Sequence, residues 1–191
     1  MQVRGRCRWL VLCIALAGAA ASIAARAQDE GRFEIRNAYV ELSNGVWLLD
    51  VRLDLALADA ARQAFEEGVP LVLELEVEGS VERRLLPDET VVSLTRRWQL
   101  AHDAISQRFV VTDRASGDHV SHSTPEEALE ALARISGIEI ADARTLPSDG
   151  RFDIRVRAAV EIGDLPAAVR MLLFWKSWSR STAWYAWKVR P

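Results

Sequence analysis

The stretch FEIRNAYVELSNGVWLLDVRLDLAL, residues 33–57, alternates apolar and polar residues on both sides of a turn. A period of two places every second side chain on the same face of a strand, so the apolar residues of 49–57 share one face. Between the two halves stands Asn44-Gly45, a pair that favours a two-residue turn because both residues tolerate positive φ. The stretch therefore predicts a long antiparallel hairpin with one buried face.

The apolar phase changes once within the first half of this hairpin. Phe33 and Ile35 stand at odd-numbered positions, whereas Ala38 and Val40 stand at even-numbered ones. One extra residue inside a strand, a β-bulge, produces such a shift. The sequence therefore predicts a bulge near Asn37.

The rest of the chain continues as strands with short helices between them. Alternation predicts strands over residues 69–78, 91–100, 109–112, 120–122, 152–162 and 182–189. A first helix is expected over 59–67, with Asp59 as N-cap and Gly68 at its end. A second is expected over 124–136, from the capping box of Thr124 and Glu127 to Gly137, and a third over 166–175. We expect an α+β fold, mainly antiparallel β: a sheet or sandwich of about seven to nine strands with two or three short helices.

The first 27 residues are typical of an export signal. Three arginines within the first eight residues precede an uncharged apolar run over residues 10–25, and Ala25 and Ala27 are the small residues that signal peptidase requires. We expect a cleaved signal over 1–27, a single β-rich domain over 28–191 and a periplasmic location. The alternative is an inner-membrane anchor formed by residues 10–25, a run shorter than the ~20 residues that cross a bilayer comfortably.

Composition excludes several functional classes. The chain has 191 residues, 24 basic and 27 acidic, and the four arginines of the signal leave the mature part with 20 basic residues and a net charge of −7. A nucleic-acid binder normally carries a dense basic stripe instead. Cys7 and Cys13 both lie in the signal, so neither disulfides nor thiol chemistry is expected beyond it. The sequence has no nucleophile elbow, phosphate loop or calcium loop, and we expect no cofactor.

The histidines offer one possible metal site. His119 and His122 have the spacing of a helical zinc pair, but they stand in a turn and short strand, where residues three apart point to opposite faces. We expect surface histidines. The alternative function is a metal-dependent hydrolase that uses His102, His119 and His122.

A row of carboxylates, Glu74, Glu76 and Glu78, occupies one face of a predicted strand. Paired carboxylates can act as general acid and base, but like charges in a row more often pair with cations on neighbouring strands. We expect structural pairing. The candidate partners are Arg83, Arg84, Arg96, Arg97, Arg151, Arg155 and Arg157.

The C-terminal part combines aromatic rings with basic charge. Four of the six tryptophans of the mature chain fall in the last 17 residues, and no acid follows Asp164. Such rings pack in a core, bind a partner or lie at a membrane interface. Alternation predicts that Trp184 and Trp187 point to opposite faces, and we expect Trp184 inside and Trp187 outside. The candidate contact surface comprises Trp175, Trp178, Arg180, Trp184, Tyr185, Trp187 and Lys188.

Five segments together resemble a known family. They are LALADAARQAFEEGVPLVLELEVE (55–78), DETVVSLTRRWQL (88–100), RFVVTDRASGD (108–118), STPEEALEAL (123–132) and STAWYAWKV (181–189). In this order they resemble the exported proteobacterial proteins grouped as domain of unknown function 4390. The resemblance implies a secreted or periplasmic protein with no established activity and no catalytic residues to carry over.

The resemblance also suggests a partner. Members of that family are often encoded beside a sensor histidine kinase of the nitrogen-regulation type, which makes such a kinase a candidate partner. With no catalytic motif, we expect a non-catalytic binding or protein-interaction module of the envelope, linked to envelope signalling. Its partner would be an envelope protein rather than nucleic acid, with peripheral membrane contact as a further possibility.

We predict that the protein recovered from cells begins at Gln28, because signal peptidase cleaves after a small residue in this context. Intact-mass measurement of the periplasmic fraction checks this, and loss of residues 1–27 is expected. Protein that keeps Met1 and fractionates with the inner membrane would contradict cleavage and support the anchor.

Overall fold

Ten strands form two antiparallel sheets within the residues that the computed structural model describes, namely 31–81, 83, 88–146, 152–163 and 179–189. All of these from Arg32 onward belong to one compact unit. The mainly antiparallel β architecture confirms the predicted fold class.

Sheet A has three strands in the order β1-β2-β7. These are β1 (Arg32–Ser43), β2 (Val46–Ala56) and β7 (Arg134–Asp142). The predicted hairpin is confirmed, since β1 pairs with β2 and both turn residues have positive φ, 51° at Asn44 and 80° at Gly45. The predicted bulge is confirmed as well, because the register shifts between Ile35 and Asn37.

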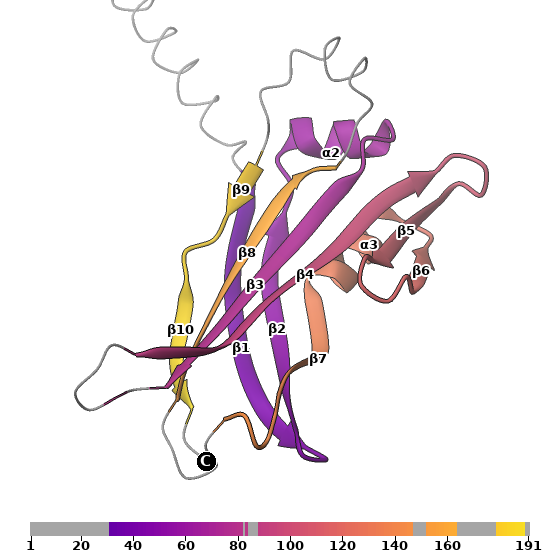
Figure 1. The fold of residues 1–191 in the computed structure, drawn as a ribbon. Helices are drawn as coiled ribbons and strands as arrows, with labels where there is room; N and C mark the ends of the chain where they lie inside the picture. The colour runs from indigo at the N-terminus through magenta and orange to yellow at the C-terminus, as the bar shows by residue number, and fades with distance from the viewer. Residues whose placement is uncertain (1–30, 82, 84–87, 147–151, 164–178, 190–191) are drawn as a thin grey trace, which may run out of the picture. The chain divides into compact units, whose positions relative to one another are not determined.

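Sheet B has seven strands, six of them in the order β10-β8-β3-β4-β5-β6, with β9 also paired to β8. They are β3 (Leu71–Val81), β4 (Glu89–Asp103), β5 (Arg108–Asp113), β6 (His119–His122), β8 (Phe152–Ile162), β9 (Ser179–Ser181) and β10 (Tyr185–Val189). The central strand β3 is hydrogen-bonded to β4 on one side and to β8 on the other (Figure 1).

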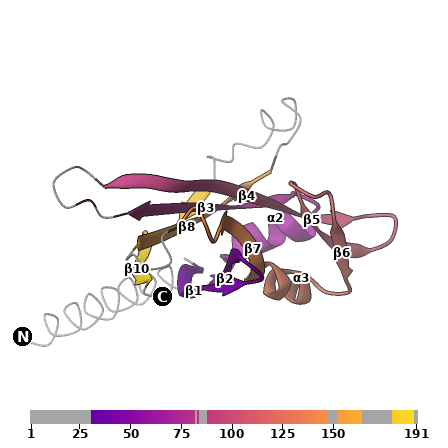
Figure 2. The ribbon, with the colours of Figure 1, turned by 60° about the horizontal axis from the view of Figure 1, so that its bottom comes forward.

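The core lies between the two sheets. Figure 2 shows β3, β4 and β8 as one layer and β1, β2 and β7 as the other. Leu49 of β2 and Leu73 and Leu75 of β3 are fully buried in one hydrophobic cluster that spans both layers. Trp47 of β2 meets Phe152 of β8 edge-on, with ring centroids 5.1 Å apart. The described residues include no cysteine, so burial of apolar area is the main stabilising contribution to this part of the chain.

Helix α2 (Asp59–Glu66) follows β2 and packs on the core through Phe65, whose ring lies 5.2 Å from that of Phe109. The predicted N-cap is wrong: Ala58 occupies that position without a side-chain bond, and Asp59 stands in the first turn. A carboxylate there still interacts favourably with the helix dipole. Gly68, with φ of 96°, ends the helix as expected.

Helix α3 (Pro125–Leu132) begins at the predicted capping box. The Thr124 hydroxyl accepts from the Glu127 amide at 3.2 Å. The Glu127 carboxylate accepts from the Ser123 amide at 3.0 Å, whereas a standard capping box uses the amide of the N-cap residue, here Thr124. The helix lies beside β7 and β6 (Figure 2). Neither α2 nor α3, the helices in the described part of the chain, is long and apolar enough to span a bilayer.

The predicted extension of α3 to Ser136 is wrong, because β7 begins at Arg134. Ile135 and Ile138 have helical spacing, yet both are buried from a strand. Between them Gly137, with φ of 70°, forms a bulge, and its amide donates to the Asp50 carboxylate at 3.0 Å. The extra residue lets two side chains three positions apart face the same side.

The terminal strand predicted over 182–189 is shorter in the structure, where β10 covers Tyr185–Val189 and residues 182–184 form a break between β9 and β10. Thr182 is buried at the break, where its amide donates to the Ala158 carbonyl at 2.8 Å and its hydroxyl accepts from the Ala158 amide at 3.1 Å. A side-chain oxygen thus replaces a backbone carbonyl beside β8. The helix predicted over 166–175 lies outside the described residues.

We predict that Gly79→Ala lowers the free energy of unfolding by about 1–3 kcal/mol, the usual penalty of overpacking. An added Cβ at Gly79 would lie 3.0 Å from the Val92 Cβ and 3.2 Å from the Ile154 Cδ1. Urea unfolding measures the change. The matched control is Ser80→Ala, on the opposite face of β3, which should stay within ~0.5 kcal/mol of wild type. Equal stability of the two variants would contradict close packing at Gly79.

Candidate functional site

Three glutamates on the outer face of sheet B are held in ion pairs. Glu74 accepts from Arg97 Nε at 2.5 Å, Glu76 binds Arg157 through both oxygens at 2.7 and 2.9 Å, and Glu78 accepts from Arg155 Nε at 2.8 Å. The predicted structural pairing is therefore confirmed for this row. The paired arginines come from β4 and β8, the two strands on either side of β3.

The other arginines named as partners of the row do not join it. Arg83 pairs with Glu89. Arg96 pairs in register with the fully buried Leu75, so it lies on the core side of β4 rather than beside the glutamates. Arg84 and Arg151 lie outside the described residues.

The C-terminal aromatic residues divide between the two faces of sheet B. The Trp184 ring lies under the guanidinium groups of Arg155 and Arg157, whose Cζ atoms are 4.7 and 4.9 Å from its centroid. Tyr185 and Trp187 pack against the core instead, with their ring centroids 5.7 Å apart. The opposite orientation of Trp184 and Trp187 is confirmed.

The assignment of Trp184 to the inside and Trp187 to the outside is wrong. Tyr185, Trp187 and Val189 alternate along β10 and share the core side, which fixes the orientation of the strand. Trp184 precedes β10, where cation–π attraction to two arginines holds it on the outer face.

The remaining residues of the predicted contact surface are only partly described. Lys188 on β10 approaches Asp153 of β8, with Nζ 3.8 Å from Oδ2. Arg180 stands on β9 opposite Val160. Trp175 and Trp178 lie outside the described residues. Of the predicted surface, the structure thus places Trp184 and Lys188 on the outer face of sheet B.

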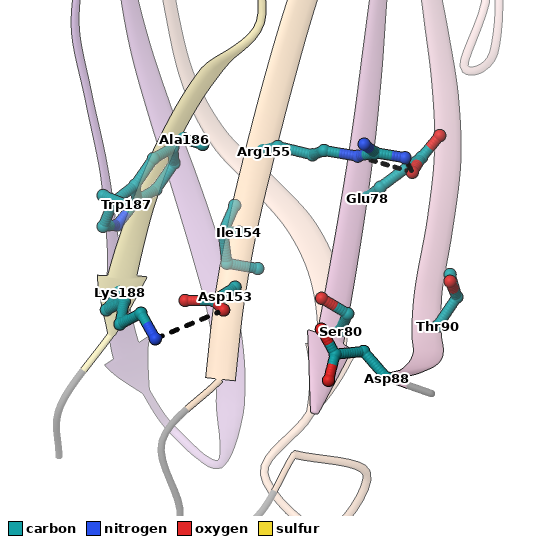
Figure 3. A pocket seen from close by; sticks show the side chains of 10 residues that line it. All are labelled: Glu78, Ser80, Asp88, Thr90, Asp153, Ile154, Arg155, Ala186, Trp187 and Lys188. Atoms are coloured by element: carbon teal, nitrogen blue, oxygen red, sulfur yellow. Dashed lines mark hydrogen bonds and ion pairs between the residues drawn. The ribbon is translucent and has the colours of Figure 1, made fainter. Parts of the chain in front are cut away.

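A polar hollow of about 480 Å³ lies at this end of the outer face. Figure 3 shows Arg155 reaching toward Glu78 and Lys188 toward Asp153, with the side chains of Ser80, Asp88 and Thr90 at its opposite side. Its two cations, Arg155 and Lys188, are engaged by carboxylates of the same face, so the hollow offers no unpaired cation of its described lining to a ligand.

The structure does not bring the three histidines together. His119 is exposed and faces away from His122, which confirms the predicted opposite faces. His102 stacks on Phe109 at 4.8 Å, and Phe109 is the register partner of both His102 and His122. Within the described ranges, no group of three or more His, Cys, Asp or Glu residues could hold a metal ion.

A larger hollow of about 710 Å³, here named the β7 cleft, lies between β7 and the core side of strands β4, β5 and β6. Its apolar lining comes from Trp98, Val111, Val120, Ala131, Leu132, Ile135 and Ile138, and its polar lining from Arg96, Asp113, Ser116, Asp118, His122, Arg134, Ser136 and Glu139, with Gly137 between. Sequence reasoning missed this site, because it depends on a strand where a helix end was predicted.

Several polar groups of the β7 cleft lack internal partners. Among the described residues, no ion pair or hydrogen bond engages the side chains of Arg96, Asp118 or Glu139. The His122 Nε2 atom is shielded from solvent and has no hydrogen-bond partner in that part of the chain. By contrast, Arg134 pairs with Glu130.

Asp113 has a structural role at one end of the cleft. Its Oδ1 atom accepts from the amides of Ala115 at 2.7 Å and Ser116 at 3.4 Å, which holds the turn between β5 and β6. The carboxylate still contributes negative charge to the lining. The lining of the cleft thus combines apolar side chains with charged groups.

Comparison with known proteins gives one match. Residues 30–188 match the family described as domain of unknown function DUF4390. No curated protein and no solved structure matches the chain. The match agrees with the resemblance seen in the sequence, and the description of the family names no activity.

We expect Trp187→Ala to lower the free energy of unfolding by roughly 2–4 kcal/mol, because the ring packs against the core. Trp184→Ala removes its contacts with two guanidinium groups and should cost only about 0.5–1 kcal/mol. Urea unfolding of the two single variants gives both values. The reverse order would mean that Trp184 is the core ring.

Proposed function

Because this chain belongs to the family DUF4390, whose description names no activity, we propose that it is a non-catalytic binding module of the bacterial envelope. The β7 cleft is its binding surface. The polar hollow on the outer face of sheet B is the less favoured place, since its cations Arg155 and Lys188 are already paired.

The observation that carries the proposal is the combination of volume, apolar lining and unpaired charge in the β7 cleft. A volume of about 710 Å³ falls in the range of ligand-binding clefts. Half-buried polar groups without partners are costly to a fold, so their presence favours a role in binding. Arg96, which is half-buried, and the His122 Nε2 atom, which is shielded from solvent, are such groups, whereas Glu139 is exposed.

Several features favour binding over catalysis. Catalysis by acid and base needs titratable groups that converge on one reacting atom. The glutamate row is instead engaged by arginines of β4 and β8. His119 faces away from His122, and Phe109 lies between His122 and His102. In the described chain the three histidines therefore do not form the metal site that the hydrolase alternative requires.

Export and cleavage of residues 1–27 are part of the proposal and rest on the N-terminal sequence. The candidate partner is an envelope protein. A sensor histidine kinase is one such protein, on the basis of the family resemblance alone, and in that case the domain contributes to envelope signalling.

A site-specific photo-crosslinking experiment tests the proposed surface. A photoreactive amino acid replaces Val120, which lines the cleft and is 60% exposed, in intact cells that express the full chain. The matched control is Tyr39, which is 50% exposed on the outer face of sheet A. We expect a discrete crosslinked product from position 120 and none from position 39.

The proposal fails if position 120 gives no crosslink in cells where the protein accumulates, or if both positions give the same products. Both side chains are largely exposed, so we expect either replacement to leave the thermal stability at the wild-type value. Unchanged thermal stability then excludes misfolding as the cause of a missing crosslink.

A further inference from the structure

The bulge in β7 decides which side chains of that strand face the β7 cleft. Ile138 pairs with Leu49 and Ile135 with Val51, so β7 takes three steps where β2 takes two. Both isoleucines are buried, and both line the cleft. Because side chains alternate along a strand, a bulge at another place would turn one of the two isoleucines away from the core. The wall that β7 gives the cleft therefore depends on where the bulge lies.

Asp50 lies opposite the extra residue of this bulge. It is the residue of β2 between Leu49 and Val51, and its Oδ1 atom accepts from the Gly137 amide at 3.0 Å. A bulge takes one residue out of the regular ladder, so a side-chain carboxylate serves here as the acceptor. A hydrogen bond to a charged acceptor is stronger than one between neutral groups. The bond therefore favours a bulge at Gly137 over one at a neighbouring residue.

The backbone at Gly137 favours the same location. Its φ of 70° lies in the left-handed region, which residues with a Cβ adopt only at a cost. An added Cβ would meet no atom within 4 Å, so the conformation rather than the space favours glycine. Backbone conformation and side-chain bond thus act on one residue.

Backbone contacts with β2 anchor β7 on both sides of the bulge. The Ala133 carbonyl, at the end of α3, accepts from the Leu53 amide at 2.9 Å. Beyond the bulge, Ile138 is in register with Leu49. Between these anchors the register gives residues 136 and 137 no partner on β2. Asp50 acts on this short segment.

We infer that Asp50 is a positioning residue for the β7 cleft. From the outer face of sheet A it fixes the bulge at Gly137, and thereby the side chains of β7 that the cleft presents to its partner. Asp50 does not line the cleft itself. The inference rests on the proposed function for the role of the cleft, and it concerns how the site is shaped.

Amide hydrogen exchange and amide chemical shifts of Asp50→Ala test this in protein purified from cells that express the full chain. We expect the Gly137 amide to exchange at least about tenfold faster than in wild type, because it loses a charged acceptor. The amide resonances of Ile135, Ser136 and Ile138 should shift. Asp50→Asn keeps an acceptor oxygen and should restore slow exchange.

The matched control is Asp54→Ala, on the same strand and face. It removes the same charge and an ion pair with Arg36, but the pairing of β2 with β7 ends at Arg52. Exchange at Gly137 should stay at the wild-type rate in this control. Equal changes in the two alanine variants, or wild-type values in Asp50→Ala, overturn the inference.

Tyr39→Phe separates a second contact of Asp50. The Tyr39 hydroxyl is hydrogen-bonded to Asp50, and this bond is the main cause of its raised pKa. Tyr39 lies on β1, on the side of β2 away from β7. Its replacement should leave exchange at Gly137 unchanged. Fast exchange in Tyr39→Phe equal to that of Asp50→Ala would assign the effect to the contact with β1 and overturn the inference.

Gly137→Ala tests the bulge from the other strand and keeps Asp50. The left-handed φ is costly for alanine, so the bulge should move and shift the same resonances, those of Ile135, Ser136 and Ile138. This variant decides the question also where Asp50→Ala fails to fold. Wild-type resonances in Gly137→Ala would mean that the bulge does not shape the cleft.

Crosslinking from position 120 in intact cells connects the bulge with partner binding. We expect the crosslink to fall at least about threefold in Asp50→Ala and in Gly137→Ala, and to persist in Asp54→Ala. An unchanged crosslink in Asp50→Ala overturns the positioning role. A wild-type protein that gives no crosslink rejects the proposed function instead, and the amide data then still decide whether Asp50 fixes the bulge.

Discussion

The rest of the structure depends on the central strand β3, whose apolar side chains are buried while both of its edges are hydrogen-bonded. Leu73, Leu75 and Val77 have no exposed surface. Because side chains alternate along a strand, burying this set forces Glu74, Glu76 and Glu78 onto the opposite face. Three carboxylates in a row repel one another unless cations neutralise them, and the arginines of β4 and β8 do so. The glutamate row is thus a consequence of the core.

The same constraint reaches the end of the chain. The paired Arg155 and Arg157 present their guanidinium groups to Trp184, and the Thr182 hydroxyl bonds to β8 just before it. These contacts hold the connection between β9 and β10 against sheet B. Exposed ion pairs contribute little individually, about 0.2–1 kcal/mol. The same arginines also provide the cation–π contacts that hold Trp184 on the outer face.

Alternation of apolar and polar residues along the sequence correctly predicted the strands whose position depends on neighbouring residues alone. The hairpin of residues 33–57, its bulge near Asn37 and the strand Phe152–Ile162 all follow from period-two alternation. The start of β7 could not be predicted that way, since the bulge at Gly137 gives Ile135 and Ile138 helical spacing. The orientation of Trp184 depends on arginines distant in sequence. The β7 cleft could not be predicted either, because its walls come from α3 and four strands that are brought together by contacts between residues distant in sequence.

The bulges of sheet A affect whether a second molecule can add a strand to the edges of this sheet. Both edge strands of that sheet, β1 and β7, carry extra residues, one after Ile35 and others near Gly137 and Ile140. A flat edge with evenly spaced amides is a template on which a second molecule can add a strand, and repetition of that step gives aggregates. Irregular edges do not match an incoming strand. Both edges of sheet A therefore carry a feature that opposes the addition of a further strand.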